Sequence, residues 1–554
     1  MSRIDHRVFI LICLVVWIIG TSNGARILLS SEEGSGSHFS VLSTIGHALS
    51  DKGHHVTALI SEANKDMATD DKFRHLKFDI FPDSTMAYTK DWFAFVVSNE
   101  MKNKRSLFGN IPLPSPRAIY GIFKRCQEQV DHAIENKRKG IKYDLLILDF
   151  HKSCSVVLAG ALDTPYVFVV PSGIKPSQAR RYGSSSTTAY YPEMSSGLQS
   201  EMGFFNRFSN TLTSIQEDLS IFFLYDVYYF LLSFHFWLSP RVSHIMSGSE
   251  LILVNSDFAV DFPFPLHPNV ITIGGLSART PNALNEDWMK LMSASQEHGV
   301  VIFSLGTYAD GTLRMDDIRT IARVFSLLKQ TVIWQSKQDL HSDVSLSPNI
   351  RVFPWIPQND LLGHPSVRLL IFHGGNNGMH EAVYHGTPMV VIPLGLDHFD
   401  VAARVVQRGI GLYLDFSRLT QEHMLKAINT VLHDSSFKAS AERASEIMRG
   451  RLDHPLNRSV HWIEHVLKHK GSYLRPSSSK LYFWQLYLLD IYIALAIMSF
   501  IAYKLLKLVL RLSIRLWNDA YMRDRMRRCK LISIKHVMLI CVFFVIFYIF
   551  LVRV

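Results

Sequence analysis

Short apolar runs alternate with longer stretches of helical periodicity over most of the chain. In a first series, spanning residues 26–280, the apolar runs fall at 27–30, 56–60, 145–148, 166–170 and 251–254. In a second series, which starts at Gly299, they fall at 300–304, 332–334, 350–353, 368–372 and 389–392. Continuous apolar runs of this length are typical of strands buried on both faces, with the helical stretches as crossover connections. The pattern predicts two α/β domains, each built on a parallel sheet.

A turn-rich segment separates the two series. Residues 263–281 hold several prolines and the pair Gly274-Gly275, which is typical of the approach to an interdomain linker. We therefore expect a first domain over residues 25–285 and a second over residues 296–452.

Three apolar runs concern export or a membrane. The first follows two arginines and precedes small residues, which predicts a secretory signal peptide over residues 1–24, with an uncleaved anchor as the alternative. Residues 483–503 are long enough to cross a bilayer, and only Asp490 is charged there. Residues 537–552 are short for a span and fit either a second short helix or a re-entrant one.

The aromatic stretch at residues 219–238 is ambiguous. Asp226 and His235 interrupt it, which argues against a bilayer span. We expect a buried helix of the first domain here. A helix that dips into one leaflet of a membrane is the alternative.

The positive charge is concentrated near the C-terminus. The 554-residue chain has a net charge of +10, and residues 504–536 contribute +8 of it, from ten basic and two acidic residues. A basic cluster directly after an apolar run indicates a cytoplasmic segment, not a surface for nucleic acid. The part before the span is then lumenal. Only Cys126 and Cys154 remain there after the signal peptide, and the sequence leaves open whether they form a disulfide.

The turn between the predicted strands at 368–372 and 389–392 carries the most informative chemistry. It reads His373-Gly-Gly-Asn-Asn-Gly378, and we expect a helix after it with Glu381 in its first turn. A strand, a glycine turn and a helix N-terminus present backbone N–H groups and a positive dipole end to a phosphate. The glycines allow the backbone to approach such a ligand closely.

The wider segment resembles the donor-site signature of the UDP-glycosyltransferase family, the membrane-bound glucuronosyltransferases and their relatives. The shared order is Trp-x-Pro-Gln-x-x-x-Leu-x-His-Pro, then His-Gly-Gly-x-Asn-Gly-x-x-Glu, then Pro-x-x-Pro-x-x-x-Asp. The resemblance covers nearly the whole chain from Arg26 to about Tyr503. It implies the GT-B fold, in which two Rossmann-like domains face each other across a cleft and the second one holds a UDP-sugar.

The resemblance also implies a role for each matched residue. Trp355 would stack on the uracil, Gln358 would bond the uridine, and Glu381 would bond the ribose hydroxyls. The diphosphate would be held by His373, Gly375, Asn377 and Gly378 on one side and by Ser304, Gly306 and Thr307 on the other.

The last matched pair departs from the family. The family has Asp-Gln where this chain has Asp397-His398, the pair implied to bond the sugar hydroxyls. A histidine can still bond a hydroxyl, and a protonated one can face a sugar carboxylate. The identity of the sugar therefore stays open.

The family's catalytic base lies in a Gly-Ser-His turn, which His38 matches after the first predicted strand. A carboxylate that orients the base is implied at Asp149, at the end of Asp144-x-x-x-x-Asp149. An imidazole of ordinary pKa, about 6.5, is largely neutral at pH 7 and able to take a hydroxyl proton. We expect the nearby helix N-terminus to help keep it neutral.

Residues 453–475 match the family's closing helix, which packs back on the first domain. This segment contains the glycosylation sequon Asn457-Arg-Ser459. The spacing of His, Cys and carboxylates does not predict a metal site, and the resemblance implies no cofactor besides the UDP-sugar co-substrate.

These observations predict an inverting glycosyltransferase of the endoplasmic reticulum membrane. It would be a type I membrane protein with a lumenal catalytic part, and whether it forms homo-oligomers stays open. It would move a hexosyl group, with glucuronosyl as the first candidate, to a hydroxyl of a small lipophilic acceptor. One alternative is a glucosyl- or galactosyltransferase acting on a sterol or sphingolipid. The other is a catalytically silent membrane protein that binds nucleotide sugars or lipids.

Overall fold

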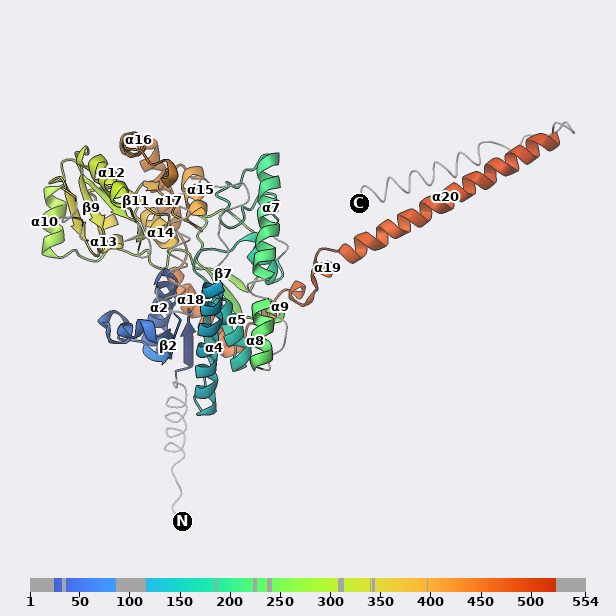
Figure 1. Ribbon diagram of the computed structural model, residues 1–554, viewed down its shortest axis with the longest axis horizontal. Coiled ribbons are helices and arrows are strands. Elements are labelled where there is room, and N and C mark those ends of the chain that lie inside the picture. Colours follow the sequence, from blue (N-terminus) through green and yellow to red (C-terminus); the bar gives the residue numbers. More distant parts are fainter. Residues whose placement is uncertain are drawn as a thin grey trace, which may run out of the picture. The chain divides into compact units, whose positions relative to one another are not determined.

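The computed structural model describes residues 24–31, 36–85, 116–184, 187–222, 227–236, 242–306, 313–338, 340, 344–395 and 397–524. They belong to two units, Met1–Leu481 and Tyr482–Val554. The first unit contains two parallel sheets with helices around them (Figure 1).

The first sheet has the strand order β3-β2-β1-β4-β5-β6-β7, and all neighbouring strands pair in parallel. Its strands are β1 (Arg26–Ser30), β2 (His55–Ser61), β3 (Lys77–Phe81), β4 (Leu145–Asp149), β5 (Tyr166–Val170), β6 (Leu251–Val254) and β7 (Val270–Thr272). Successive residues of one strand enter different cores: Leu28 joins one apolar cluster, while Ile27 and Leu29 join another. The sheet is therefore buried on both faces, as its continuous apolar runs predicted.

Helices from distant parts of the chain cover these faces. The described ones are α2 (Gly36–Asp51), α4 (Pro116–Arg138), α5 (Ser153–Leu162), α6 (Pro176–Arg181), α7 (Phe204–Ile221), α8 (Tyr228–Phe236), α9 (Val242–Ser247) and α18 (Pro455–His469). Cys126 of α4 and Leu232 of α8 pack in one core, and Leu42 of α2 packs in the other. That second core also contains Val460 and Ile463 of α18, which lies against α2 although it comes from the far end of the unit (Figure 1).

The second sheet has the strand order β10-β9-β8-β11-β12-β13 and is also parallel throughout. Its strands are β8 (Val300–Ser304), β9 (Thr331–Gln335), β10 (Ile350–Phe353), β11 (Val367–Phe372), β12 (Met389–Val391) and β13 (Gly411–Tyr413). Its helices are α10 (Glu286–Ala294), α12 (Met315–Ser326), α13 (Gln358–Leu362), α14 (Asn376–Tyr384), α15 (His398–Gln407), α16 (Gln421–His433) and α17 (Ser435–Arg449). Two apolar clusters again enclose the sheet.

Each sheet has a point at which the strand order reverses. It lies between β1 and β4 in the first sheet and between β8 and β11 in the second. Ligands of open α/β sheets bind outside the carboxyl ends of the strands at such a point. In the first sheet, His38 follows β1 and Asp149 ends β4. In the second sheet, Ser304 ends β8 and His373 follows β11.

The sequence missed three strands and misjudged one helix. The missed strands are β3, β7 and β13. β7 lies inside the segment that we expected to approach a linker, and β13 is only three residues long. The described part of the stretch at 219–238 comprises the end of α7 and α8, and it is not buried throughout, since Leu219 is 55% exposed. On α8, Tyr229 and Leu232 are buried while Leu231 is 53% exposed.

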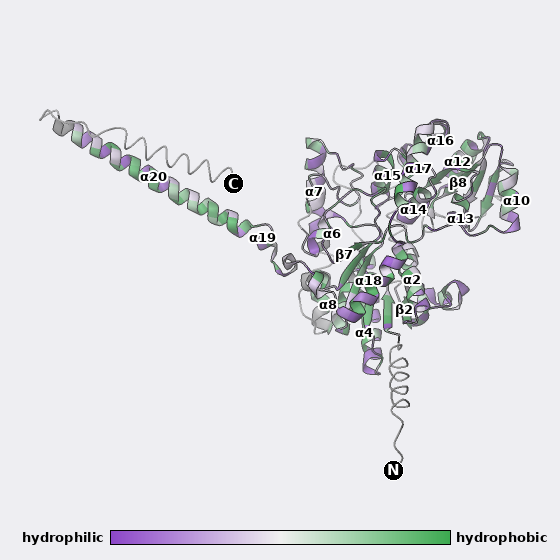
Figure 2. Cartoon of the chain, turned by 180° about the vertical axis from the view of Figure 1, so that it is seen from behind, coloured by the Kyte–Doolittle hydropathy of each residue, from purple (hydrophilic) through white to green (hydrophobic). Residues whose placement is uncertain are grey.

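The second unit consists of α19 (Phe483–Leu486) and α20 (Leu489–Asp524) in its described part. Leu488 has a φ of 55°, a left-handed conformation that ends α19, so the long helix begins later than the expected span at 483–503. Residues 504–524 contain no glycine or proline, and the helix continues through them. Residues Leu489–Tyr521 are long and apolar enough to cross a membrane, and Figure 2 shows the apolar character concentrated next to α19. The expected signal peptide up to residue 23 and the run at 537–552 lie outside the described residues.

Candidate active site

Two polar side chains meet at the carboxyl ends of the neighbouring strands β1 and β4. His38 lies in the first turn of α2, and Asp149 is the last residue of β4. His38 Nδ1–H donates a hydrogen bond of 2.7 Å to Asp149 Oδ2, and the backbone N–H of His151 donates one of 3.0 Å to Oδ1. The Asp149 side chain is fully buried, whereas the His38 side chain is 31% exposed. The pair holds Nδ1 of the imidazole and leaves Nε2 for another partner.

The two groups shift each other's pKa. Burial raises the pKa of Asp149, but the charge and hydrogen bond of His38 lower it more, to about 2. Burial lowers the pKa of His38, but the charge and hydrogen bond of Asp149 outweigh this, so it lies above its ordinary value. The expectation of an imidazole kept neutral by the helix N-terminus therefore needs correction. The buried carboxylate favours the protonated form of His38.

A histidine that the sequence did not single out lies beside this pair. The ring of His151 is 5.6 Å from that of His38, centroid to centroid. Burial, and then the charge of His38, lower the pKa of His151 to about 4, so it is neutral at pH 7. Gln178 Nε2 donates to its Nδ1 over 3.2 Å, which leaves the proton on Nε2, 2.9 Å from Ser172 Oγ. His151 could have been suspected from its place just after a strand end.

The glycine turn of the second sheet is shaped around His373. A Cβ at Gly306 would lie 2.5 Å from His373 Cε1, and one at Gly375 would lie 2.7 Å from Nε2, so only glycine leaves room for the ring. Gly306 has a φ of 76°, which also favours glycine. Gly375 caps the N-terminus of α14 and supplies no side-chain hydrogen bond to its first N–H groups. This helix end has the form of an anion site.

The expected sugar-facing residues lie next to His373. Its ring meets that of His398 edge to face, with centroids 4.8 Å apart. Burial lowers the pKa of His373 to about 3, with a further contribution from His398, and lowers that of His398 to about 4. His398 Nδ1 is buried without a hydrogen-bond partner among the described residues. Burial, and then Asp400, raise the pKa of Asp397 to about 6.

The residues expected to bind the nucleoside lie close together. The Trp355 side chain is 62% exposed, as a stacking platform requires. Gln358 Nε2 donates to Glu381 Oε2 over 2.8 Å. Burial raises the pKa of Glu381 to about 7, although the hydrogen bond from Gln358 opposes this. Glu381 lies in the second turn of α14 and not in the first, because the helix already begins at Asn376, within the glycine turn.

Side chains of the two sheets approach each other around these residues. His38 and Asp397 lie within electrostatic reach, since each shifts the pKa of the other. Asn255, directly after β6, donates from Nδ2 to Asn377 Oδ1 over 3.1 Å. The Lys72 ammonium of the first domain lies 5.9 Å from the centroid of the Trp355 ring of the second domain. The expected donor residues thus face the expected base.

A family model described as "UDP-glucoronosyl and UDP-glucosyl transferase" matches residues 25–518. The chain is a member of the UDP-glycosyltransferase family. The resemblance stated from its motifs is confirmed, and with it the enzyme class. The UDP-glycosyltransferase is 30% identical to human 2-hydroxyacylsphingosine 1-beta-galactosyltransferase over 518 residues, 92% of this chain and 93% of the relative. It is 30% identical to bovine UDP-glucuronosyltransferase 3A1 over 509 residues, 88% of this chain and 94% of that one.

Solved structures confirm the GT-B fold of the UDP-glycosyltransferase. The glycosyltransferase of kitacinnamycin matches with a TM-score of 0.57 at 16% identity and covers 80% of this chain and all of that one. The calicheamicin glycosyltransferase CalG4 matches with a TM-score of 0.52 at 15% identity, covering 80% of this chain and 99% of that one.

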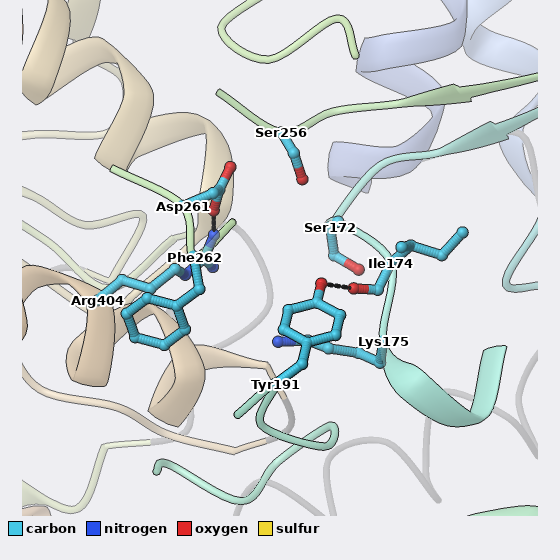
Figure 3. Close-up of a pocket in the computed structure, with 9 residues that line it drawn as sticks. Ser172, Ile174, Lys175, Tyr191, Ser256, Asp261, Phe262 and Arg404 are labelled. Carbon is cyan, nitrogen blue, oxygen red and sulfur yellow. Dashed lines mark hydrogen bonds and ion pairs between the residues drawn. The ribbon is translucent and has the colours of Figure 1, made fainter. Parts of the chain in front are cut away.

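A charged seam joins the two domains of the UDP-glycosyltransferase beside the site. Asp400 of α15 pairs with Lys175 at 3.2 Å and accepts hydrogen bonds from the backbone N–H groups of Ser195 and Gly197. The pocket in Figure 3 lies here, with Lys175 and Tyr191 across from the ion pair of Arg404 with Asp261. Its empty space is about 240 Å³ including open solvent, so little of it is enclosed. We regard it as part of the seam.

Three further expectations concern the surroundings of the site. Thr307 lies outside the described residues, so only Ser304 and Gly306 of that turn are placed. Asn457 is exposed on α18, while Ser459 of its sequon is buried and donates to the Pro455 carbonyl. Within the described ranges, His, Cys, Asp and Glu form no group of three that could hold a metal, and metal independence stays a prediction.

Proposed function

We propose that this UDP-glycosyltransferase transfers a hexosyl group with inversion to a hydroxyl of a small lipophilic acceptor, without a metal. The observation that carries the proposal is the bond between His38 and Asp149, with Asp397 of the second domain close enough to affect the pKa of His38. A buried carboxylate that fixes one imidazole nitrogen prepares the other to accept a proton.

The chemistry follows from this arrangement. His38 Nε2 takes the proton of the acceptor hydroxyl as the oxygen attacks the anomeric carbon. The bond from that carbon to the UDP oxygen breaks on the opposite face, which inverts the configuration. Asp149 stabilises the imidazolium that forms. The N-terminal turn of α14, with His373, would hold the charge that develops on the departing UDP.

For the sugar, we propose a neutral hexose over glucuronate. In the ligand-free site, burial lowers the pKa of His398 to about 4, so the ring is neutral at pH 7. As a neutral ring with an unpartnered buried Nδ1, it suits a sugar hydroxyl. The human relative named as a galactosyltransferase supports this choice. Glucuronosyl transfer, the first candidate from the sequence, becomes the second candidate here and keeps the support of several relatives named UDP-glucuronosyltransferases.

The acceptor is proposed to be a lipophilic alcohol or phenol. Relatives in human, mouse and rat are named for a sphingosine derivative as the acceptor. An apolar helix of membrane-spanning length would keep this chain where such molecules dissolve.

We also propose a lumenal orientation in the endoplasmic reticulum, because Cys126 and Cys154 form a disulfide, which persists in oxidising compartments. A protease-protection assay on intact microsomes tests this orientation.

A donor panel tests the proposed reaction. Microsomes containing the full chain receive a generic phenol with UDP-glucose, UDP-galactose or UDP-glucuronate, and the product mass is read. We expect a neutral hexoside as the main product. The His38→Ala variant should bind UDP as the wild type does and form no product. Turnover by this variant would exclude His38 as the base, and UDP binding without turnover by the wild type would favour a silent binding protein.

A further inference from the structure

Helix α7 carries its large apolar side chains on the outside. Phe204, Phe205, Phe208, Ile215 and Leu219 are between 51% and 81% exposed. Their spacing places them along one side of an α-helix. In both views α7 stands at the edge of the first unit (Figures 1 and 2). The helix therefore presents a continuous apolar face to its surroundings.

The opposite side of α7 is polar, and two of its side chains, Asn210 and Ser214, are buried. Asn210 Nδ2 donates to the carbonyls of Thr188 and Tyr191, and its Oδ1 accepts from the Glu193 backbone N–H over 2.7 Å. Ser214 Oγ, one turn later, donates to Glu193 Oε2 over 2.8 Å. A helix of a water-soluble surface turns its apolar side inward, so α7 has the reverse arrangement.

The buried contacts fix this orientation. Arg180 adds hydrogen bonds to Ser214 Oγ at 2.7 Å and to Asp218 Oδ2 at 2.5 Å. Rolling α7 to bury its phenyl rings would break the bonds of Asn210 and Ser214, and each buried polar group left unpaired costs about 1–3 kcal/mol. The apolar face is therefore held outward, although contiguous exposed apolar patches are rare on proteins surrounded only by water.

The chain itself supplies a candidate for what covers this face. Seven residues, 482–488, join the first unit to the apolar helix that begins at Leu489. Even fully extended they reach only about 25 Å. When α20 is inserted, the bilayer surface is thus within about 25 Å of Leu481, at which the first unit ends. None of the five outward side chains carries a charge, which suits acyl chains.

We propose that α7 lies flat in the interfacial layer of the membrane that anchors the chain, with its outward apolar face among the lipid acyl chains. Its 18 residues form a rod about 27 Å long, and a helix with one apolar and one polar side lies in the membrane plane. The sequence had suggested membrane contact at 219–238 as an alternative. The structure places the apolar face mainly before that stretch.

Lipid photo-crosslinking of the full-length chain tests the proposal. The protein is reconstituted in phosphatidylcholine liposomes that contain a phosphatidylcholine with a diazirine in its acyl chain. After irradiation, labelled peptides are identified by mass. We expect label on residues 204–219 as well as on α20, and none on Ile119 and Tyr120 of α4, which are 49% and 57% exposed.

Variants separate α7 from other apolar surface. The double substitution Phe205→Asp, Phe208→Asp should abolish the label on α7 and leave that on α20. Ile447→Asp, at a 58% exposed position of α17, should change neither. UDP binding checks that each variant is folded. The labelling pattern of the wild type tests the proposal even if a variant does not fold. Label on α20 without label on α7 would refute the proposal. So would protein cross-links between the α7 helices of two copies without lipid label, which would make this face an interface between copies.

Discussion

Replacing Asp149 by asparagine tests the proposed catalytic pair at one atom. Asp149 Oδ1 accepts the backbone N–H of His151, so an asparagine would keep its carbonyl oxygen there and turn its amide nitrogen to His38. That nitrogen is a donor, and His38 Nδ1 would have to accept. The imidazole proton would move to Nε2, the atom that is meant to take the acceptor proton. The variant should therefore fold, bind UDP and react slowly.

The structure gives a minimum size for the effect. The pKa of Asp149 falls from 3.8 to about 2, which corresponds to roughly 2–3 kcal/mol of interaction with its surroundings, His38 foremost. Losing this stabilisation of the imidazolium lowers the rate about 30–150-fold, and the wrong tautomer lowers it further. We expect kcat/KM to fall at least about 100-fold, with UDP affinity unchanged.

The pH profile distinguishes this effect from structural damage. Asp149 raises the pKa of His38, whereas burial alone lowers it, so the acid limb of kcat/KM should move to lower pH in the variant. Asp79→Asn is the matched control, because Asp79 accepts a 2.6 Å bond from His132 away from the donor residues. It should leave the limb in place. An unmoved acid limb in Asp149→Asn would refute the proposed pairing.

Three further predictions concern the donor side. Trp355→Ala should weaken UDP binding about 10- to 100-fold in calorimetry, which is the range for loss of one stacked base. The melting temperature of the protein should hardly change, because the Trp355 side chain is already exposed. Glu381→Gln should stabilise the ligand-free protein at pH 8 by up to about 3 kcal/mol in urea unfolding while weakening UDP binding. The gain should fade below pH 7 and vanish below about pH 4.5, because the carboxyl is then protonated in both states. Gly306→Ala should destabilise the protein more than Gly53→Ala does, and it should also abolish UDP binding. Both glycines have a positive φ, but only at Gly306 would a Cβ meet the ring of His373.

The sequence predicted most of the sheets because their strands are buried on both faces. The five apolar runs of the second series coincide with β8 to β12 to within a residue or two at each end. β3 could not be recognised in the same way, since Lys77 and Ile80 are exposed and the pattern is mixed. β7 and β13 are edge strands of three residues, too short for a periodicity to appear.

The candidate site was predictable where its residues lie in motifs that the family shares. The donor turn and the pair of His38 with Asp149 were located through family motifs. Their electrostatics were not, because the raised pKa of His38 depends on a carboxylate 111 residues away. The orientation of α7 was also hidden. Asn210 and Ser214 read as a polar surface until their partners are known.

The seam between the domains connects these features physically. Glu193 holds the buried side of α7, and the backbone N–H groups of Ser195 and Gly197, a few residues on, bind Asp400. Asp400 lies in the first turn of α15, the helix that begins at His398. A short segment thus joins the apolar helix to the helix of the second domain that begins at His398. These bonds span about 200 residues, so no local pattern could reveal them, and through them the segment that packs on α7 also contacts the donor domain.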